Sequence, residues 1–459
     1  MNHDVVVVGA GTAGLVCARA LVDKGFSVVL LERGGADSFG SPWCNDLDLG
    51  PFAKYGLPEP LPDELAFGVH RPVRMLSPDH ETQFLIPRHA NYPLMMSRYQ
   101  HRLAADCVGA GVDVRFGVDA KEVLHENGFV TGVRCLGADG KSFDLQARVT
   151  VLACGNQTPI LHRLPLFCGV DLGWHPFDVV HAIQELWEVD PDRACRAVEQ
   201  GRVYDGEMDF MVGLPGAGGF STFMYQLDTR QGRVGLLAAS KPHVQDVTPP
   251  RLMLDRFVEK LGFCTRRVYG GGRPLVMRRP ADLMAANGLC LVGESAYTTS
   301  PANGSGTSPS MVSAMMCARV VNQVLGAGHK PTRENLWPYC HAFQTGFGAV
   351  FAGYYANQLL LRTLPEEVVG TLFRRGVTRA EDFDRIHEAK PIRVGMADGL
   401  SRLRAGVGTP GPLARFALQG VRAETLMRHY RNYPKTFEPR TWAKWIGRTR
   451  KLFVRAGMV

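Results

Sequence analysis

The sequence lacks the cysteine spacing of a metal-binding or disulfide-rich protein. Its eleven cysteines are scattered over 459 residues, and no Cys-x-x-Cys pair occurs. An odd number without pattern in so long a chain favours a reducing compartment and argues against a disulfide framework or a zinc site. A signal peptide is not expected either, because the polar start Met1–Asp4 leads directly into an apolar run. We therefore expect a cytoplasmic protein that has no metal site.

A clean membrane span is missing as well. Residues 342–361 carry no charged side chain, but three Gly, two Gln and one Asn interrupt them. This pattern predicts a buried helix or the wall of a substrate pocket rather than a span.

Acidic residues are scarce near the C-terminus. From Pro391 to Val459 the chain has 14 Lys/Arg and 3 Asp/Glu, a net +11, so the first 390 residues carry −3 of the total of +8. Apolar and basic residues alternate there at helical spacing, the apolar ones being Trp442, Trp445, Ile446, Leu452 and Phe453, and the basic ones Lys444, Arg448, Arg450, Lys451 and Arg455. Such a helix lies on an anionic membrane or packs on the protein body with solvated charges. Nucleic-acid binding is not expected, because no nucleic-acid module accompanies the charge.

A dinucleotide-binding pattern opens the chain. The apolar run Val5–Val8 is typical of a buried parallel strand and leads into Gly9-x-Gly11-x-x-Gly14, after which 15–22 have helical spacing. The first glycine permits a tight turn, the second admits a pyrophosphate and the third lets helix and strand pack closely. The phosphates are then expected at the helix N-terminus, beside Thr12 and Ala13.

An acid follows the second strand. Residues 27–31 read as a strand that ends at Glu32, whose carboxylate can accept hydrogen bonds from ribose hydroxyls. A carboxylate there disfavours a 2′-phosphate, and Arg33 beside it is included in the predicted cofactor site. Strand, loop, helix, strand and acid within 32 residues are a specific signal, although they do not distinguish FAD from NAD.

A second glycine-rich turn near residue 293 resolves that choice. The apolar run 289–292 precedes Gly293-Glu294, and Pro301-x-x-Gly304-x-Gly306-Thr307 follows. Ser308 is the expected N-cap and Pro309 the expected first residue of a helix that ends at Gly326. Backbone N–H groups at such a helix N-terminus can face the pyrimidine end of an isoalloxazine ring.

These motifs, in this order, resemble those of the geranylgeranyl reductase family, within the para-hydroxybenzoate hydroxylase-like flavoproteins. The resemblance covers nearly the whole length and implies FAD as cofactor. It implies that Glu294, where relatives usually have Asp, binds the ribityl chain. It also implies that Cys44, in the similar segment Gly40-Ser41-Pro42-Trp43-Cys44, lies near the flavin and acts in catalysis, and that Arg98 contacts a flavin phosphate.

The chain departs from these relatives at two motifs. The strand 149–153 continues into Cys154-Gly155-Asn156, where the hydroxylases have an Asp-Gly pair tied to pyridine-nucleotide use. The segment 219–225 lacks the Trp and Pro with which the reductases line their lipid site. The first departure disfavours a monooxygenase, and the second indicates a different substrate.

The motif order predicts an α/β fold: a Rossmann-like FAD-binding domain, an inserted antiparallel β-sheet substrate domain and a C-terminal helical region. We assign 1–65, 90–165 and 275–335 to the first, 66–89 and 166–274 to the second, and 336–459 to the third. Hairpins are expected around the turns 77–80 and 228–232. No second Rossmann loop is expected, since Gly213–Gly219 and Gly270–Gly272 read as turns joining strands. Tyr225 and Tyr297 are expected to pack in the core, and His175 to lie in a loop.

The leading hypothesis is an FAD-dependent oxidoreductase that reduces C=C bonds of a hydrophobic, isoprenoid-like substrate by hydride transfer from reduced flavin. The electron donor is left open between NAD(P)H and a ferredoxin-type protein, and peripheral membrane contact is an added expectation. Two alternatives remain: an FAD-dependent monooxygenase that uses NAD(P)H and O2, and a non-redox FAD protein such as an isomerase or cyclase.

Overall fold

A mainly parallel sheet is built around the N-terminal apolar strand. The computed structural model describes residues 2–77, 81–212, 221–241, 247–392, 401–402 and 410–458. The N-terminal strand pairs in parallel with one strand on each side. Each of those two strands pairs in parallel with the next strand outward. In sheet order the strands are β15 (Ala285–Ala286), β16 (Leu289–Leu291), β9 (Ser142–Leu152), β1 (Asn2–Val8), β2 (Val28–Glu32) and β6 (Asp113–Phe116), while β7 (Asp119–Glu126) and β8 (Phe129–Leu136) join through β9.

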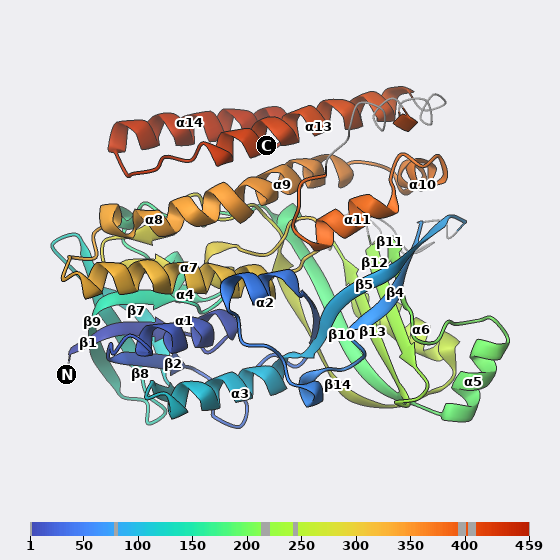
Figure 1. Ribbon diagram of the computed structural model, residues 1–459, viewed down its shortest axis with the longest axis horizontal. Coiled ribbons are helices and arrows are strands. Elements are labelled where there is room, and N and C mark those ends of the chain that lie inside the picture. Colours follow the sequence, from blue (N-terminus) through green and yellow to red (C-terminus); the bar gives the residue numbers. More distant parts are fainter. Residues whose placement is uncertain are drawn as a thin grey trace.

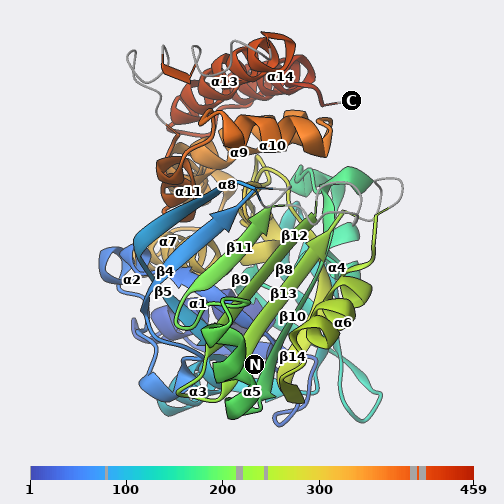
Figure 2. The same ribbon diagram turned by 90° about the vertical axis from the view of Figure 1, so that its right-hand side faces the viewer.

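A second sheet stands beside the first and is largely antiparallel (Figures 1 and 2). The exception is the parallel pair β11–β4. Both expected hairpins are present, as β4–β5 and β12–β13. The order is β14 (Cys264–Val276), β10 (Val179–Val189), β13 (Arg233–Ser240), β12 (Ser221–Asp228), β11 (Met208–Val212), β4 (His70–Leu76), β5 (Gln83–Met95) and β3 (Cys44–Asp48).

Helices cover both sheets and form an outer layer (Figure 1). α7 packs against α1 on the first sheet, α6 packs on the second, and α13 lies along α9. The helices of the first sheet are α1 (Thr12–Val22), α3 (Met96–Gly109), α4 (Pro159–His162) and α7 (Thr307–Gly326), and α2 (Gly50–Tyr55) lies beside α7. The helices of the second sheet are α5 (Pro191–Glu199) and α6 (Pro250–Leu261). The C-terminal region consists of α8 (Arg333–Phe343), α9 (Ala349–Leu361), α10 (Glu366–Arg374), α11 (Ala380–His387), α13 (Pro410–Arg431) and α14 (Pro439–Ala456).

The predicted fold class is confirmed, because a parallel α/β sheet, an antiparallel sheet and a helical C-terminal region are all present. The first sheet takes its strands from 2–32, 113–152 and 285–291, and the second from 44–48, 70–95 and 179–276. The exact domain ranges stay a prediction. The uncharged stretch 342–361 contains all of α9, preceded by the last residues of α8 and a π-helical turn (Gln344–Gly348), and is largely buried, as expected. In the described residues, no helix combines the length and apolarity needed to cross a bilayer.

Candidate functional site

The glycine loop between β1 and α1 has no room for a side chain at two of its three motif glycines, but it has room at the third. Gly9 has φ +102°, and a Cβ there would lie 2.6 Å from the carbonyl oxygen of Ala153. A Cβ at Gly14 would overlap the carbonyl oxygen of Gly9. At Gly11 the nearest atom to such a Cβ is 3.9 Å away. The first and third glycines are therefore required by the protein's own packing, whereas the middle one faces open space.

That open space lies at the N-terminus of α1. Gly11 is the N-cap, no side chain caps the helix, and no acid lies in its first turn, which begins at Thr12 and Ala13. The first-turn N–H groups of a helix have no intrahelical partner, and together with the helix dipole they favour an anion. This geometry fits a pyrophosphate, which needs close approach to the backbone at Gly11.

Glu32 is held at the carboxyl end of β2. Its Oε2 accepts a hydrogen bond from the N–H of Ala10 at 2.9 Å, and its Oε1 accepts one from the N–H of Gly34 at 2.7 Å. Each carboxylate oxygen keeps a further lone pair, so the oriented side chain can still accept ribose hydroxyls. Arg33 beside it is exposed.

The two glycine motifs, ~280 residues apart in sequence, meet in space. Gly293 follows β16 with φ +62°, and a Cβ there would lie 2.9 Å from the Cβ of Ala13. Its N–H donates to Ser313 Oγ at 2.9 Å, which ties the turn to α7. The turn at Gly293 therefore lies beside the N-terminus of α1.

The start of α7 differs from expectation. The N-cap is Gly306 and the helix begins at Thr307, so the prediction of Ser308 as N-cap is wrong. Pro309 is compatible with this, because a residue in the first turn needs no intrahelical N–H bond. No side chain caps α7 and no acid lies in its first turn, so this N-terminus is also open to an electron-rich group. Pro301 and Gly304, with φ +75°, form the loop before it.

Cys44 faces this loop from the start of β3. Its neighbour Asn45 donates through Nδ2 to Thr307 Oγ1 at 2.6 Å, which joins β3 to α7. The Cys44 side chain is buried and lines the central cavity. Burial, reinforced by the Asp46 carboxylate, raises the pKa of the thiol to about 12. Cys44 is therefore a protonated thiol at neutral pH.

Glu294 makes an ion pair that the sequence did not indicate. Its Oε2 lies 3.0 Å from Nη1 of Arg273, and the second oxygen contacts Nη2. The Arg273 guanidinium lies over the ring of Trp43, 4.4 Å from its centroid. The three side chains form a half-buried layer beside Cys44, and ribityl binding by Glu294 stays a prediction.

Arg98 lies apart from these residues. Its guanidinium is exposed and donates to the carbonyl oxygen of Asp63 at 2.8 Å. It belongs to a small surface hollow with Leu61 and His101 rather than to the central cavity. Contact with a flavin phosphate remains a prediction for this residue.

The glycines at 270–272 are not a turn. They lie within β14 and pair with β10, so the prediction of a turn is wrong. A Cβ at Gly271 would lie 2.8 Å from Pro42 Cγ, and one at Gly272 would lie 2.8 Å from Ile183 Cγ1. These glycines let the segment before Cys44 pack directly on the strand. The predicted turn at Gly213–Gly219 lies outside the described residues.

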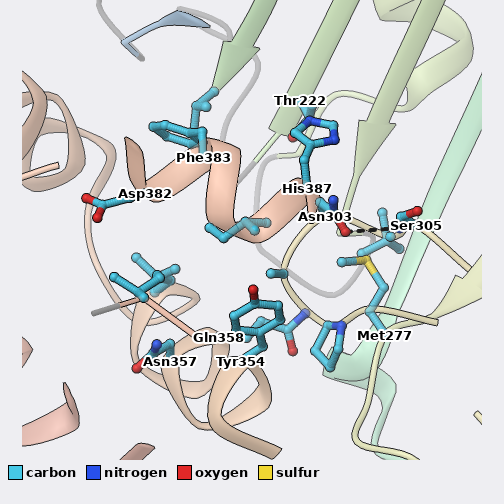
Figure 3. Close-up of a pocket in the computed structure, with 18 of the residues that line it drawn as sticks. Thr222, Met277, Asn303, Ser305, Tyr354, Asn357, Gln358, Asp382, Phe383 and His387 are labelled. Atoms are coloured by element: carbon cyan, nitrogen blue, oxygen red, sulfur yellow. Dashed lines mark hydrogen bonds between the residues drawn. The ribbon is translucent and has the colours of Figure 1, made fainter. Parts of the chain in front are cut away.

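The second sheet, α9, α11 and α13 enclose one large cavity of about 1350 Å³ that reaches the Pro301–Thr307 loop. Its walls are predominantly apolar, as is typical of ligand pockets. Figure 3 shows Tyr354 and Gln358 reaching in from α9, on the side facing Met277. The uncharged stretch indicated the α9 wall, but no local pattern indicated α11 and α13, which join it only through tertiary packing.

The remaining predicted residues have structural roles. Tyr297 donates its hydroxyl to the carbonyl oxygen of Leu172 at 2.7 Å and is buried, and Tyr225 packs in the core of the second sheet. His175 lies exposed in a loop. All three predictions are confirmed. The eleven cysteines are all free thiols, as expected.

The apolar face of α14 is used within the protein. Trp445 and Phe453 are buried against α13 and α9, and Trp442 stacks on Trp445 with ring centroids 5.3 Å apart. The basic residues of α14 are exposed. Of the two alternatives for this helix, packing on the body is the one that the structure shows, so the apolar face is not offered to a membrane.

Comparisons with known proteins agree with this geometry. The family model for FAD-dependent oxidoreductases matches residues 4–45. The digeranylgeranylglycerophospholipid reductase of Sulfolobus acidocaldarius is 22% identical over 454 residues, covering 97% of this chain and 96% of the relative. That of Methanoculleus marisnigri is 26% identical over 379 residues, covering 81% and 89%.

Solved structures show the same fold. A geranylgeranyl bacteriochlorophyll reductase-like protein from Thermoplasma acidophilum superposes with a TM-score of 0.70 at 18% identity, covering 91% of this chain and 99% of that one. A myxobacterial FAD-dependent halogenase gives a TM-score of 0.60 at 19% identity, covering 94% and 97%.

Proposed function

We propose that the chain is an FAD-dependent oxidoreductase of the geranylgeranyl reductase kind and that it reduces C=C bonds of an isoprenoid substrate; the matches to FAD-dependent oxidoreductases and to digeranylgeranylglycerophospholipid reductases support this. The observation that carries the proposal is the cavity of about 1350 Å³, apolar over most of its wall, which reaches both Cys44 and the Pro301–Thr307 loop. A long hydrocarbon chain fits such walls, because burying its surface is favourable by about 25 cal/mol per Å².

The residues present fit FAD. Gly11 leaves room for a pyrophosphate at α1, Glu32 presents an oriented carboxylate to a ribose, and no side chain caps the N-terminus of α7. FAD, when bound, supplies hydride transfer. The protein positions the substrate against it and excludes water through the apolar wall.

We assign Cys44 a role in handling the proton that the second alkene carbon must receive. The thiol is buried, protonated and on the cavity wall. It packs in a small apolar cluster with Phe67, Met95 and Leu186. A thiol of such high pKa does not release a proton to water at neutral pH, so it holds one until a stronger base forms on the substrate.

The test is anaerobic reoxidation. Holoprotein reduced with dithionite is mixed under argon with a geranylgeranyl lipid, and the flavin absorbance is followed. We expect reoxidation only when the lipid is added, with a product in which one double bond has gained two hydrogen atoms for each flavin reoxidised. Reoxidation that requires O2 and inserts oxygen into the product would establish a monooxygenase instead, and the saturated phytanyl lipid is the matched negative control.

We further propose that α14 contacts anionic membranes through charge alone. Its six exposed basic residues each add about 1 kcal/mol of attraction near an anionic surface, and they are Arg440, Lys444, Arg448, Arg450, Lys451 and Arg455. Binding to phosphatidylglycerol vesicles should be lost in 0.5 M salt (roughly a 4 Å Debye length) and absent with phosphatidylcholine. Salt-resistant binding would point to insertion and contradict the proposal.

A further inference from the structure

Arg273 places a positive charge on the cavity wall near the loop that we assign to the flavin. Arg273 and Leu275 lie on β14, and Met277 directly follows it, so the three side chains share one face of the strand. All three line the cavity. Leu275 Cδ1 lies 3.8 Å, and Met277 Sδ 3.7 Å, from the position that a Cβ of Gly304 would take. The face of β14 that carries Arg273 therefore borders the Pro301–Thr307 loop.

Two side chains hold the Arg273 guanidinium in one position. Its Nη1 lies 3.0 Å from Glu294 Oε2, and its Nη2 contacts Glu294 Oε1, so the ion pair is bidentate. Its Cζ lies over the ring of Trp43, 4.4 Å from the centroid, which is the geometry of a cation–π contact. A bidentate pair has a fixed orientation as well as a fixed distance. The positive charge is therefore localised on the wall rather than carried by a mobile side chain.

The third nitrogen of the guanidinium has an unused donor. Nε of Arg273 is buried and has no hydrogen-bond partner among the residues that the structure describes. Buried donors in folded proteins are normally satisfied. An unmet donor on a cation is an independent indication that an electron-rich group completes this part of the site.

Glu294 is the residue whose charge Arg273 balances. It follows Gly293, whose turn lies beside the N-terminus of α1, and it is the residue that we expect to bind the ribityl chain. An unpaired carboxylate at that position would place negative charge next to a cofactor that becomes more negative when it is reduced. Because charge near a flavin tunes its electronics, pairing with Arg273 removes an obstacle to reduction.

We propose that Arg273 sets the reduction potential of the bound flavin, because its positive charge offsets Glu294 and favours the reduced state. Two electrons from the donor, NAD(P)H or a ferredoxin-type protein, and one proton reduce the flavin, and one negative charge then remains on its ring. A cation in a wall of low polarity stabilises that charge more than it would in water. The inference goes beyond the proposed function, because it rests on FAD binding and holds for any substrate of the cavity.

The midpoint potential of the holoprotein tests the proposal without any substrate. Holoprotein is equilibrated with a reference dye under argon at pH 7, with xanthine and xanthine oxidase as the source of electrons. In Arg273→Met the equilibrium constant for reduction should fall by at least about fivefold, which is about 20 mV for a two-electron couple. A smaller fall, or a rise, would overturn the proposal. Since no alkene is present, a failure of the reductase activity would not affect this result.

Charge reversal at the partner provides a second, opposite test. Glu294→Gln removes the negative charge and leaves Arg273 unbalanced, so the same constant should rise by at least the same factor. In the double variant the two shifts should cancel to within that factor, and Arg273→Lys, which keeps the charge, should also stay within it. Single variants that shift the potential in the same direction would show a structural pair and overturn the proposal.

Arg266→Met is the matched control. Arg266 lies on the same strand and forms the same kind of ion pair, with its Nε 3.0 Å from Glu188 Oε2, but the two side chains are 66% and 45% exposed. This variant should keep the wild-type potential, and a shift equal to that of Arg273→Met would overturn the assignment to Arg273. Thermal unfolding checks that each variant folds. If Arg273→Met does not retain FAD, Glu294→Gln decides alone, and a fall or a smaller rise there would overturn the proposal.

Discussion

Substituting Gly11 by alanine should separate cofactor binding from folding. The residue has φ −67° and ψ 169°, which alanine adopts without strain, and a methyl group there would lie 3.9 Å from its nearest neighbour. Gly→Ala at such a position stabilises by about 0.4–1 kcal/mol through the unfolded chain. Alanine is also a poorer N-cap than glycine by up to about 1 kcal/mol. These terms offset each other, so the apoprotein's unfolding free energy should stay within about 1 kcal/mol of wild type.

FAD affinity should fall, because the methyl group occupies the space that the pyrophosphate needs. Losing one charge-assisted hydrogen bond to a phosphate costs about 1.5–3 kcal/mol, which corresponds to roughly a ten- to hundredfold rise in Kd. Apoprotein is prepared for both proteins, Kd is measured by quenching of flavin fluorescence, and stability by urea unfolding.

The matched control is Gly14→Ala, where the added methyl group would overlap the carbonyl oxygen of Gly9 even without cofactor. That variant should lose stability as apoprotein. If Gly11→Ala binds FAD as tightly as wild type, the assignment of the open space at α1 to the pyrophosphate is refuted.

Two further predictions concern individual side chains. The Cys44 thiol, with its pKa raised to about 12, should react with iodoacetamide far more slowly than the exposed Cys195. The reaction rate of Cys44 should rise about tenfold per pH unit between pH 8 and 11, because only the thiolate reacts. A rate that stops rising near pH 9 would show that Cys44 has an ordinary thiol pKa. Trp445→Ala should lower the unfolding free energy by about 3–5 kcal/mol, because the ring is buried between α13 and α14, and a loss below 1 kcal/mol would show that α14 is not packed there.

The parts of the fold that follow from local sequence could be predicted. The run Val5–Val8, the glycines that follow and the acid at Glu32 specify one strand–helix–strand unit, because each residue type is required by geometry within that unit. The hairpins β4–β5 and β12–β13 are similarly local. The meeting of Gly293 with Ala13 was expected from the family resemblance rather than from either segment alone.

The parts of the fold that depend on tertiary contact could not be predicted from the sequence. Gly270–Gly272 read as a turn because glycines are frequent in turns, whereas here they admit Pro42 and Ile183 against a strand. Ser308 is a good N-cap by residue type, but the loop fixed by Asn45 and Thr307 starts the helix earlier. Lys241 and Arg362 are 121 positions apart, and no pattern in either neighbourhood indicates that they share a cavity wall.

A single-turnover experiment under argon tests the central claim most directly. Dithionite-reduced holoprotein, freed of excess reductant, is mixed with geranylgeranyl phosphate, and the product is analysed by mass spectrometry after the flavin absorbance stops changing. The account predicts that one double bond gains two hydrogen atoms for each flavin reoxidised. An unchanged substrate beside a flavin that stays reduced, or a product that gains oxygen only after air is admitted, would contradict it.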